Sequence, residues 1–278
     1  MNNTLFNDRI ERKYQIGIAE SEVAGLWRDL CSCLAPYGLS PAQEIASVGS
    51  VYFDNRDCDL LRYSLFGHLM LIRLRTYETY GRPPEPRGGY WVEVKTAADE
   101  RRKKRRFQLP KSALYQLVEG GEPGESISDF NKDDADQDVV FDLYRDTQEM
   151  IVTMGLKPLI LVLYKRISFQ NDLERLSIDW DLQYYYVTKN VLEADSWKYL
   201  AVPAEGKSDT IIMEIKHLQG DFPVWFTELQ RRYPIRRREY LKTLEGMSFL
   251  FQGPLKHHKE ANFFLPRIDA YLTNSHLG

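Results

Sequence analysis

Charged residues stand two positions apart inside segments that are otherwise apolar. These pairs are Glu11-x-Lys13, Arg73-x-Arg75, Glu93-x-Lys95, Asp179-x-Asp181 and Glu214-x-Lys216, and Tyr164, Arg166 and Ser168 continue the pattern. Side chains two residues apart lie on the same face of a β-strand. The residues between them, such as Ile72, Leu74, Val92 and Val94, are apolar. Several strands are therefore predicted to carry one charged face and one apolar face.

Two architectures satisfy this pattern. One is an open antiparallel sheet whose charged face lies in water and whose apolar face packs on helices. The other is a closed barrel with the charges inside and the helices outside. The paired residues are long and include few Ser, Thr or Gln, which favours the barrel. Cations that face one another in a lumen repel unless an anion is present, so such a lumen would suit a metal-bound polyanion.

Short segments rich in Val, Ile, Tyr, Phe and Leu predict the strands. They are residues 11–18, 46–53, 69–77, 90–96, 105–109, 159–169, 175–186 and 210–216. Helical spacing predicts helices over 22–34, 111–118, 141–154, 222–233 and 242–251. Residues 81–89 and 119–138 are predicted to be loops.

The bulk composition excludes several classes of protein. The chain of 278 residues has a net charge of −3, so it is not a polycation that coats nucleic acid. Its three cysteines provide no disulfide framework. The polar start is unlike a signal peptide, and no apolar run reaches the ~20 residues that span a bilayer. We therefore expect a soluble cytoplasmic protein. The sequence also lacks the glycine-rich phosphate loop of Walker-type nucleotide folds.

The run Arg-Arg-Lys-Lys-Arg-Arg at 101–106 has two interpretations. Such a run is commonly a surface patch for nucleic acid or a targeting signal. Here it leads into Phe107, so it also reads as the start of a strand. Arg102, Lys104 and Arg106 would then share one face. We expect at least part of this run to face the anion site.

At this point the motifs resemble those of a known family, the VTC domain, the catalytic module of the vacuolar transporter chaperone complex and of many bacterial proteins. Arg9-x-Glu11-x-Lys13-Tyr14 resembles its opening motif, and Ile72-Arg73-Leu74-Arg75 and Val92-Glu93-Val94-Lys95 resemble its next charged strands. Lys104-Arg105-Arg106-Phe107, Tyr164-x-Arg166, Ser177-Ile178-Asp179 and Met213-Glu214-Ile215-Lys216 follow in family order. Each motif alone is weak, but the ordered set spans about residues 9 to 246.

The resemblance implies an α+β fold of the triphosphate-tunnel (CYTH) type, an eight-stranded antiparallel barrel with helices packed outside. It implies a domain over 1–246, followed by an extension, 247–278, of unknown role. It also implies a polyphosphate polymerase that uses Mn²⁺ or Mg²⁺ to transfer the γ-phosphate of ATP to a growing chain.

The same resemblance suggests roles for individual residues. Lys13, Arg73, Arg75, Lys95, Lys104, Arg106, Arg166 and Lys216 would bind phosphates, Arg73, Arg75 and Lys242 would act in catalysis, and Glu214, with Glu11 or Glu93, would hold the metal. Lys242 matches the lysine of the family's final motif, but its neighbours Leu241 and Thr243 differ from that motif. A triphosphate or tripolyphosphate hydrolase, and a polyphosphate-binding module without activity, remain alternative functions.

Overall fold

The computed structural model describes residues 10–42, 44–68, 70–80, 88–98, 101–124, 126–132, 137–218 and 222–274, without the side chains of 97, 98, 101–103 and 274. The described strands form one antiparallel sheet in the order β11-β1-β10-β8-β7-β3-β4-β5-β6, with β2 beside β7 and β9 beside β8. They are β1 Ile10–Ile16, β2 Ser40–Pro41, β3 Ala46–Asp54, β4 Met70–Thr79, β5 Gly89–Ala98, β6 Arg101–Pro110, β7 Lys157–Gln170, β8 Glu174–Tyr186, β9 Gly206–Ser208, β10 Ile211–His217 and β11 Ile235–Arg237. All eight predicted strands are present, and β2, β9 and β11 are additional short strands.

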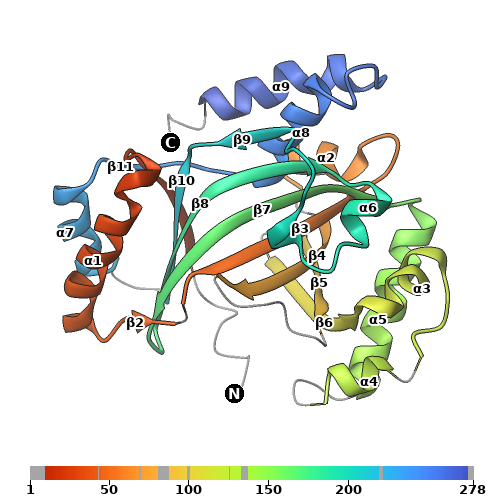
Figure 1. The fold of residues 1–278 in the computed structure, drawn as a ribbon, viewed down its shortest axis with the longest axis horizontal. Helices are drawn as coiled ribbons and strands as arrows, with labels where there is room; N and C mark the ends of the chain where they lie inside the picture. Colours follow the sequence, from red (N-terminus) through yellow and green to blue (C-terminus); the bar gives the residue numbers. More distant parts are fainter. Residues whose placement is uncertain are drawn as a thin grey trace.

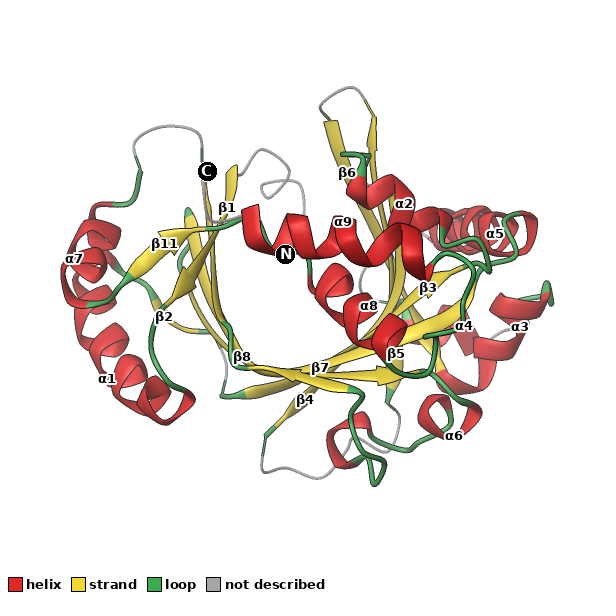
Figure 2. Cartoon of the chain, turned by 90° about the horizontal axis from the view of Figure 1, so that it is seen from above, coloured by secondary structure: helices red, strands yellow, loops and turns green. Residues whose placement is uncertain are grey.

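The sheet curls into a trough but does not close into a barrel (Figure 2). On the side away from β10, β1 pairs with β11, where Gln15 lies opposite Arg236. Part of the β1 edge that would face β6 in a closed barrel, Tyr14–Ile16, is therefore paired with β11. No described residue of β6 pairs with β1 or β11. The antiparallel α+β class is confirmed, but the predicted closure into eight strands is wrong.

Helices cover the convex face of the sheet (Figure 1). The described helices are α1 Val23–Leu34, α2 Asp59–Leu65, α3 Leu114–Glu119, α4 Ser126–Phe130, α5 Gln137–Thr153, α6 Lys189–Leu192, α7 Val224–Arg232, α8 Lys242–Gln252 and α9 Ala261–Asn274. Leu26 of α1 and Trp225 of α7 pack on the convex side of β1, β8 and β10. Leu117 and Tyr144 belong to a second core under β3 to β7, with Ile72 among its strand residues. Among the described helices, none is long and apolar enough to cross a membrane.

Helices α8 and α9 pack instead on the concave side of the sheet (Figure 2). The sequence had predicted all the helices to lie outside the barrel, so this position differs from the prediction. Leu244 and Met247 of α8 and Phe264 of α9 form a buried core with Ile160 and Tyr184. Side chains at alternate positions of β7 and β8 therefore fill one end of the trough, which we call the covered end. The predicted domain boundary after residue 246 falls inside α8.

Part of the predicted acidic loop at 119–138 is helical. Helix α4 lies in it and buries Ile127 in the core under β6. Asn131 accepts a hydrogen bond from the Gln108 backbone N–H at 2.8 Å and so ties this segment to β6. Residues 133–136 of this loop and residues 81–87 of the other predicted loop lie outside the described residues.

One of the predicted same-face pairs does not share a face. Asp181 has φ 53°, and the pairing of β7 with β8 shifts register between Leu163 and Lys165. Such a bulge inserts a residue and inverts the alternation of faces. Asp179 therefore lies on the concave face, whereas Asp181 bonds Lys165 at 2.9 Å on the convex side.

Candidate anion-binding site

The concave face beside α8 carries a concentration of charged side chains, which we call the concave cluster. Its cations are Lys13 (β1), Arg73 and Arg75 (β4), Lys95 (β5), Lys104 (β6), Arg166 (β7), Arg175 (β8), Lys216 (β10) and Lys242 (α8), and its carboxylates are Glu11 (β1), Glu93 (β5), Asp179 (β8) and Glu214 (β10). Nine cations against four carboxylates leave an excess of five positive charges when all the groups are ionised. Strand pairing accounts for the convergence, because residues directly opposite in an antiparallel pair share a face. Arg73 lies opposite Glu93, for example, and Arg166 opposite Asp179.

The curl of the sheet brings the two sides of this cluster together. Burial raises the pKa of Glu214, but the charges of Lys216, Lys13, Arg166 and Lys95 more than offset this and hold it well below its usual range. Lys95 is on β5, which is not a neighbour of β10 in the sheet. The two strands therefore influence each other across the interior of the trough.

Glu93 is the centre of one half of the cluster. Arg73 donates from Nε to Oε2 of Glu93 at 2.6 Å, and Lys104 Nζ lies 2.6 Å from Oε1. Burial raises the pKa of this fully buried carboxyl, yet Arg73 and Arg75 outweigh burial and keep it far below its ordinary value. With three cations around it, Glu93 is poorly placed to act as a metal ligand.

Arg75 is held mainly by neutral oxygens. It donates to Ser50 Oγ at 3.0 Å and to the hydroxyls of Tyr77 and Tyr164, each at 3.3 Å. The nearest carboxylate contact is to Glu93, at 3.7 Å. Its guanidinium group is therefore fixed in position while its charge is only partly compensated.

Asp179 links the sheet to α8. It accepts two hydrogen bonds from Arg166, at 2.5 and 2.7 Å, and one from Lys242 Nζ at 2.8 Å. Lys242 is the first residue of α8, and its side chain extends into the cluster despite the different neighbours in its motif. Asp179 was predicted to lie in a strand but was not among the predicted site residues.

Glu11 and Glu214 are the carboxylates best placed for a divalent cation. Lys216 Nζ lies 3.1 Å from Glu11 and 3.2 Å from Glu214, so one ammonium group bridges the two. Lys13 Nζ donates to the Tyr240 carbonyl at 3.1 Å and lies 3.8 Å from Glu11. No group of three or more Asp, Glu, His or Cys side chains gathers for metal binding in the described parts of the chain. Two carboxylates fit Mg²⁺ or Mn²⁺, which commonly complete their coordination with water and phosphate oxygens.

Two cations of the cluster have no hydrogen-bond or ion-pair partner among the described residues. Lys95 makes no hydrogen bond or ion pair with another described residue, and Arg73, followed by burial, lowers its pKa well below the usual lysine range. The Nε of Arg175 is buried without a hydrogen-bond partner in the described structure, and burial, followed by Arg166, lowers its pKa. Arg175 was not among the predicted site residues, although its alternation with Ser177 and Asp179 could have revealed it.

The basic run at 101–106 divides between the two faces of β6. Lys104 reaches Glu93 on the concave side, whereas Arg105 bonds Asp146 of α5 on the convex side at 2.9 Å. Arg106 is opposite Glu93 in register, and its guanidinium lies 4.2 Å from the Trp91 ring centroid. It shares the concave face but forms no ion pair with a carboxylate of the described residues. The side chains of 101–103 are not described.

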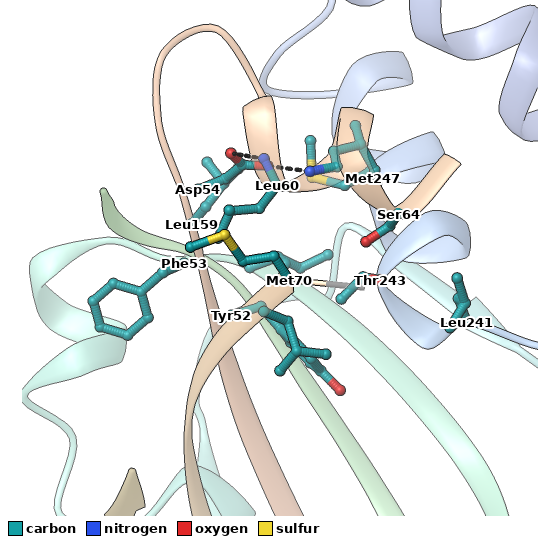
Figure 3. A pocket seen from close by; sticks show the side chains of 13 residues that line it. Tyr52, Phe53, Asp54, Leu60, Ser64, Met70, Leu159, Leu241, Thr243 and Met247 are labelled. Atoms are coloured by element: carbon teal, nitrogen blue, oxygen red, sulfur yellow. Dashed lines mark hydrogen bonds between the residues drawn. The ribbon is translucent and has the colours of Figure 1, made fainter. Parts of the chain in front are cut away.

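A separate apolar cavity lies behind the covered end (Figure 3). It has a volume of about 40 Å³, and Leu159, Met70 and Met247 are among the residues that line it. That volume admits a few water molecules and is too small for a triphosphate. Tyr52 connects the cavity to the cluster, because its hydroxyl accepts a hydrogen bond from Arg73 at 3.1 Å.

The comparison with protein families agrees with this geometry. Residues 6–251 match the model of the VTC domain. The chain belongs to the VTC domain family. The match contains every member of the concave cluster of this VTC domain, from Glu11 to Lys242, and it ends inside α8. Helix α9 lies beyond it.

Solved structures similar to this VTC domain have low sequence identity to it. A candidate adenylate cyclase from Bacillus halodurans is 16% identical, with a TM-score of 0.45 over 84% of this chain and 93% of its own. A candidate adenylate cyclase from Vibrio parahaemolyticus is 10% identical, with a TM-score of 0.37 over 81% and 84%. A Pyrococcus horikoshii protein is 12% identical, with a TM-score of 0.39 over 87% and 99%. No curated protein matches the chain.

Proposed function

We propose that this VTC domain binds the triphosphate of ATP in the concave cluster and transfers the γ-phosphate to the end of a polyphosphate chain. The supporting observation is the excess of positive charge on the concave face, which includes Lys95 and Arg175, two cations that pair with no other described residue. A polyanion would compensate this charge. The guanidinium group is suited to this because its donors match pairs of phosphate oxygens.

The location of the cations favours an extended phosphate chain over a nucleic acid duplex. Arg73, Arg75 and Arg166 are each more than nine-tenths buried, on the floor of a trough. A duplex cannot approach side chains at that depth, whereas a chain of phosphates is narrow enough to lie along them. Nucleic acid is therefore not expected to be a partner.

The reaction requires charge stabilisation and alignment rather than a covalent intermediate. A terminal phosphate oxygen of the acceptor chain attacks the γ-phosphorus of ATP, and the bond from that phosphorus to the β,γ-bridging oxygen breaks. ADP leaves with the electron pair, and the acceptor gains one phosphate. Arg73, Arg75 and Lys242 would stabilise the negative charge that develops on the transferred group and the leaving oxygen. The acceptor oxygen is already an anion, so this step needs no general base.

Glu11 and Glu214 would hold Mn²⁺ or Mg²⁺. Such an ion, when bound, neutralises phosphate charge and orients the oxygens. Lys216, which bridges the two carboxylates, would then have to move toward a phosphate oxygen. We do not place Glu93 in this role, because its oxygens are occupied by Arg73 and Lys104.

A tripolyphosphate or triphosphate hydrolase is the second candidate, and the covered end of the trough favours it. Leu244 and Met247 of α8 fill the concave face there with apolar side chains. These side chains would block the exit of a growing polymer at the covered end. The polymer would then have to leave through the opposite end of the trough, which we call the mouth and through which the nucleotide also enters. Water as the acceptor avoids this constraint.

Phosphorus NMR of the purified protein with ATP and Mn²⁺ tests the proposal. A polymerase produces the resonance of internal chain phosphates together with ADP, and a hydrolase produces orthophosphate. No change in the ATP spectrum, in a protein that binds tripolyphosphate by calorimetry, would leave only a binding module and overturn both catalytic proposals. Arg105→Ala is the matched control, since this arginine lies on the same strand but faces α5.

A further inference from the structure

The concave face changes character toward the end of the trough opposite α8. There β4 ends and β5 begins, and Tyr77 and Trp91 stand on the same face as Arg75 and Glu93. Tyr77 is 40% exposed, and its hydroxyl accepts a hydrogen bond from Arg75 at 3.3 Å. Aromatic side chains thus follow the charged cluster at the end that α8 does not fill.

Trp91 and Arg106 form a stacked pair at this place. Trp91 is half-buried and lies opposite Arg75 in register. The exposed Arg106 lies over its ring at 4.2 Å and makes no hydrogen bond or ion pair with another described residue. Neither the indole N–H of Trp91 nor the guanidinium is committed to a protein acceptor in the described structure. The phosphate-binding role expected of Arg106 does not account for its stacking on Trp91, because binding a phosphate needs only the cation.

We propose that Trp91 and Arg106 form a binding site for the nucleobase, so that the substrate is a nucleoside triphosphate held with its γ-phosphate inward and its base at the mouth. The inference rests on the proposed function. Bases stack on aromatic rings and on arginine planes, and every base has a face that can do so.

The apolar core at the covered end determines this orientation. Ile160, Tyr184 and Leu244 are buried there, so no space remains for a nucleoside on that side of the cluster. At the other end, Trp91 is two residues from Glu93 along β5, which is about 7 Å in a strand. That separation is comparable with the span from the phosphates of a nucleotide to its base. A triphosphate beside Arg73 and Arg75 would therefore bring its base to Trp91.

Calorimetry with two ligands tests the inference, using ATP and inorganic tripolyphosphate without divalent metal so that no turnover occurs. Because base stacking contributes about 1–3 kcal/mol, Trp91→Ala should weaken ATP binding by about tenfold or more. It should leave tripolyphosphate affinity within about twofold, which also reports that the variant is folded. Tyr199→Ala is the matched control, since this tyrosine is 62% exposed and is not part of the cluster.

Tryptophan fluorescence provides a second readout that does not depend on the truncated variant. ATP should quench the emission of the wild-type protein, tripolyphosphate should not, and Trp91→Phe should abolish the ATP quench. Equal weakening of both ligands by Trp91→Ala, or no weakening of either, would overturn the base site while leaving triphosphate binding intact. A wild-type protein that binds neither ligand would overturn the proposed function and the base site together.

Discussion

At the scale of single residues, the four carboxylates of the concave cluster differ in the type of cation that pairs with them. Glu93 and Asp179 each hold arginines in place, whereas Glu11 and Glu214 share one lysine. A divalent cation can displace an ammonium group more easily than it can displace a forked arginine from a carboxylate. This difference supports the proposal that Glu214 and Glu11 are the metal ligands.

Glu214→Gln tests that assignment. The change removes one charged oxygen ligand and keeps the basic face, so metal-dependent turnover of ATP should fall by at least about tenfold. Tripolyphosphate affinity without metal should stay the same or rise, because a negative charge has been lost. Steady-state rates over a Mn²⁺ titration and calorimetry measure the two effects. Wild-type turnover at every Mn²⁺ concentration would place the metal elsewhere.

Lys95 leads to a prediction about protons. The neighbouring charge of Arg73 and then burial lower its pKa well below the usual lysine range. A lowered pKa favours the neutral amine in the empty protein, and a bound polyanion would raise that pKa again. Binding should therefore be coupled to proton uptake at Lys95, and this part of the affinity should increase as the pH falls.

Titrations of tripolyphosphate in buffers of different ionisation enthalpy measure this uptake. Tripolyphosphate has its own titration, so the comparison is between wild type and Lys95→Met at the same pH. The wild type should take up more protons on binding than the variant. Identical proton counts for the two proteins would show that Lys95 is already charged, or that it lies apart from the bound phosphates.

At the scale of elements, α8 determines the shape of the trough. A Cβ at Gly246 would lie 2.6 Å from Cδ1 of Tyr184 and closer still to Ile160, so this helix rests on the floor of the sheet. Gly246→Val should lower the free energy of unfolding by about 1–3 kcal/mol through overpacking. Gly25→Ala in α1 is the control, because a Cβ there meets nothing within 4 Å.

Denaturant unfolding should give opposite signs for these two glycine substitutions. Gly25→Ala should be stabilising by up to about 1 kcal/mol, because alanine has the higher helix propensity. If Gly246→Val were also neutral or stabilising, α8 would not be seated on the concave face. The conclusion that α8 fills the covered end of the trough would then be wrong.

The sequence revealed the elements that have a long and regular period. The eight strands were predicted from segments rich in Val, Ile, Tyr, Phe and Leu, and regular alternation supports that prediction in strands such as β4 and β5. The three-residue β11 has no period of its own, and its pairing with β1 joins residues more than 200 positions apart. Helix α9 contains Pro266, which usually argues against a helix interior. The formation of β11 and of α9 is therefore determined by long-range contacts rather than by local sequence preference.

The same limits apply to the site. Arg73, Arg75, Glu93 and Lys95 were predicted to share a face, and the pleat of a regular strand brings them together. Asp181 was placed on the wrong face because a bulge cannot be read from alternation. Arg175 was missed because its alternate neighbour is serine rather than a charged residue.

At the scale of the whole molecule, the trough has an apolar end, a charged middle and an aromatic mouth. The net charge of the chain is −3, while the concave cluster alone has an excess of five positive charges when all its groups are ionised. The cations are therefore concentrated where the sheet curls, and the compensating acidic residues lie elsewhere. This separation costs stability in the empty protein through repulsion between like charges, and a bound polyanion would relieve it.

Calorimetric titration of Arg75→Ala with tripolyphosphate is the sharpest test of phosphate binding in the concave cluster. Arg75 has three neutral hydrogen-bond partners and faces the middle of the trough. If it binds phosphate, its loss removes a charge-assisted hydrogen bond of about 1.5–3 kcal/mol and weakens affinity by about tenfold or more. The melting temperature of the empty variant should be unchanged or higher, because Arg73 loses a repelling neighbour.

Arg105→Ala provides the comparison, since it removes an arginine whose exposed ion pair on the convex face contributes only about 0–1 kcal/mol to stability. We expect a large loss of tripolyphosphate affinity for Arg75→Ala and none for Arg105→Ala. Equal affinities for Arg75→Ala, Arg105→Ala and the wild-type protein would contradict the claim that the concave cluster binds phosphate.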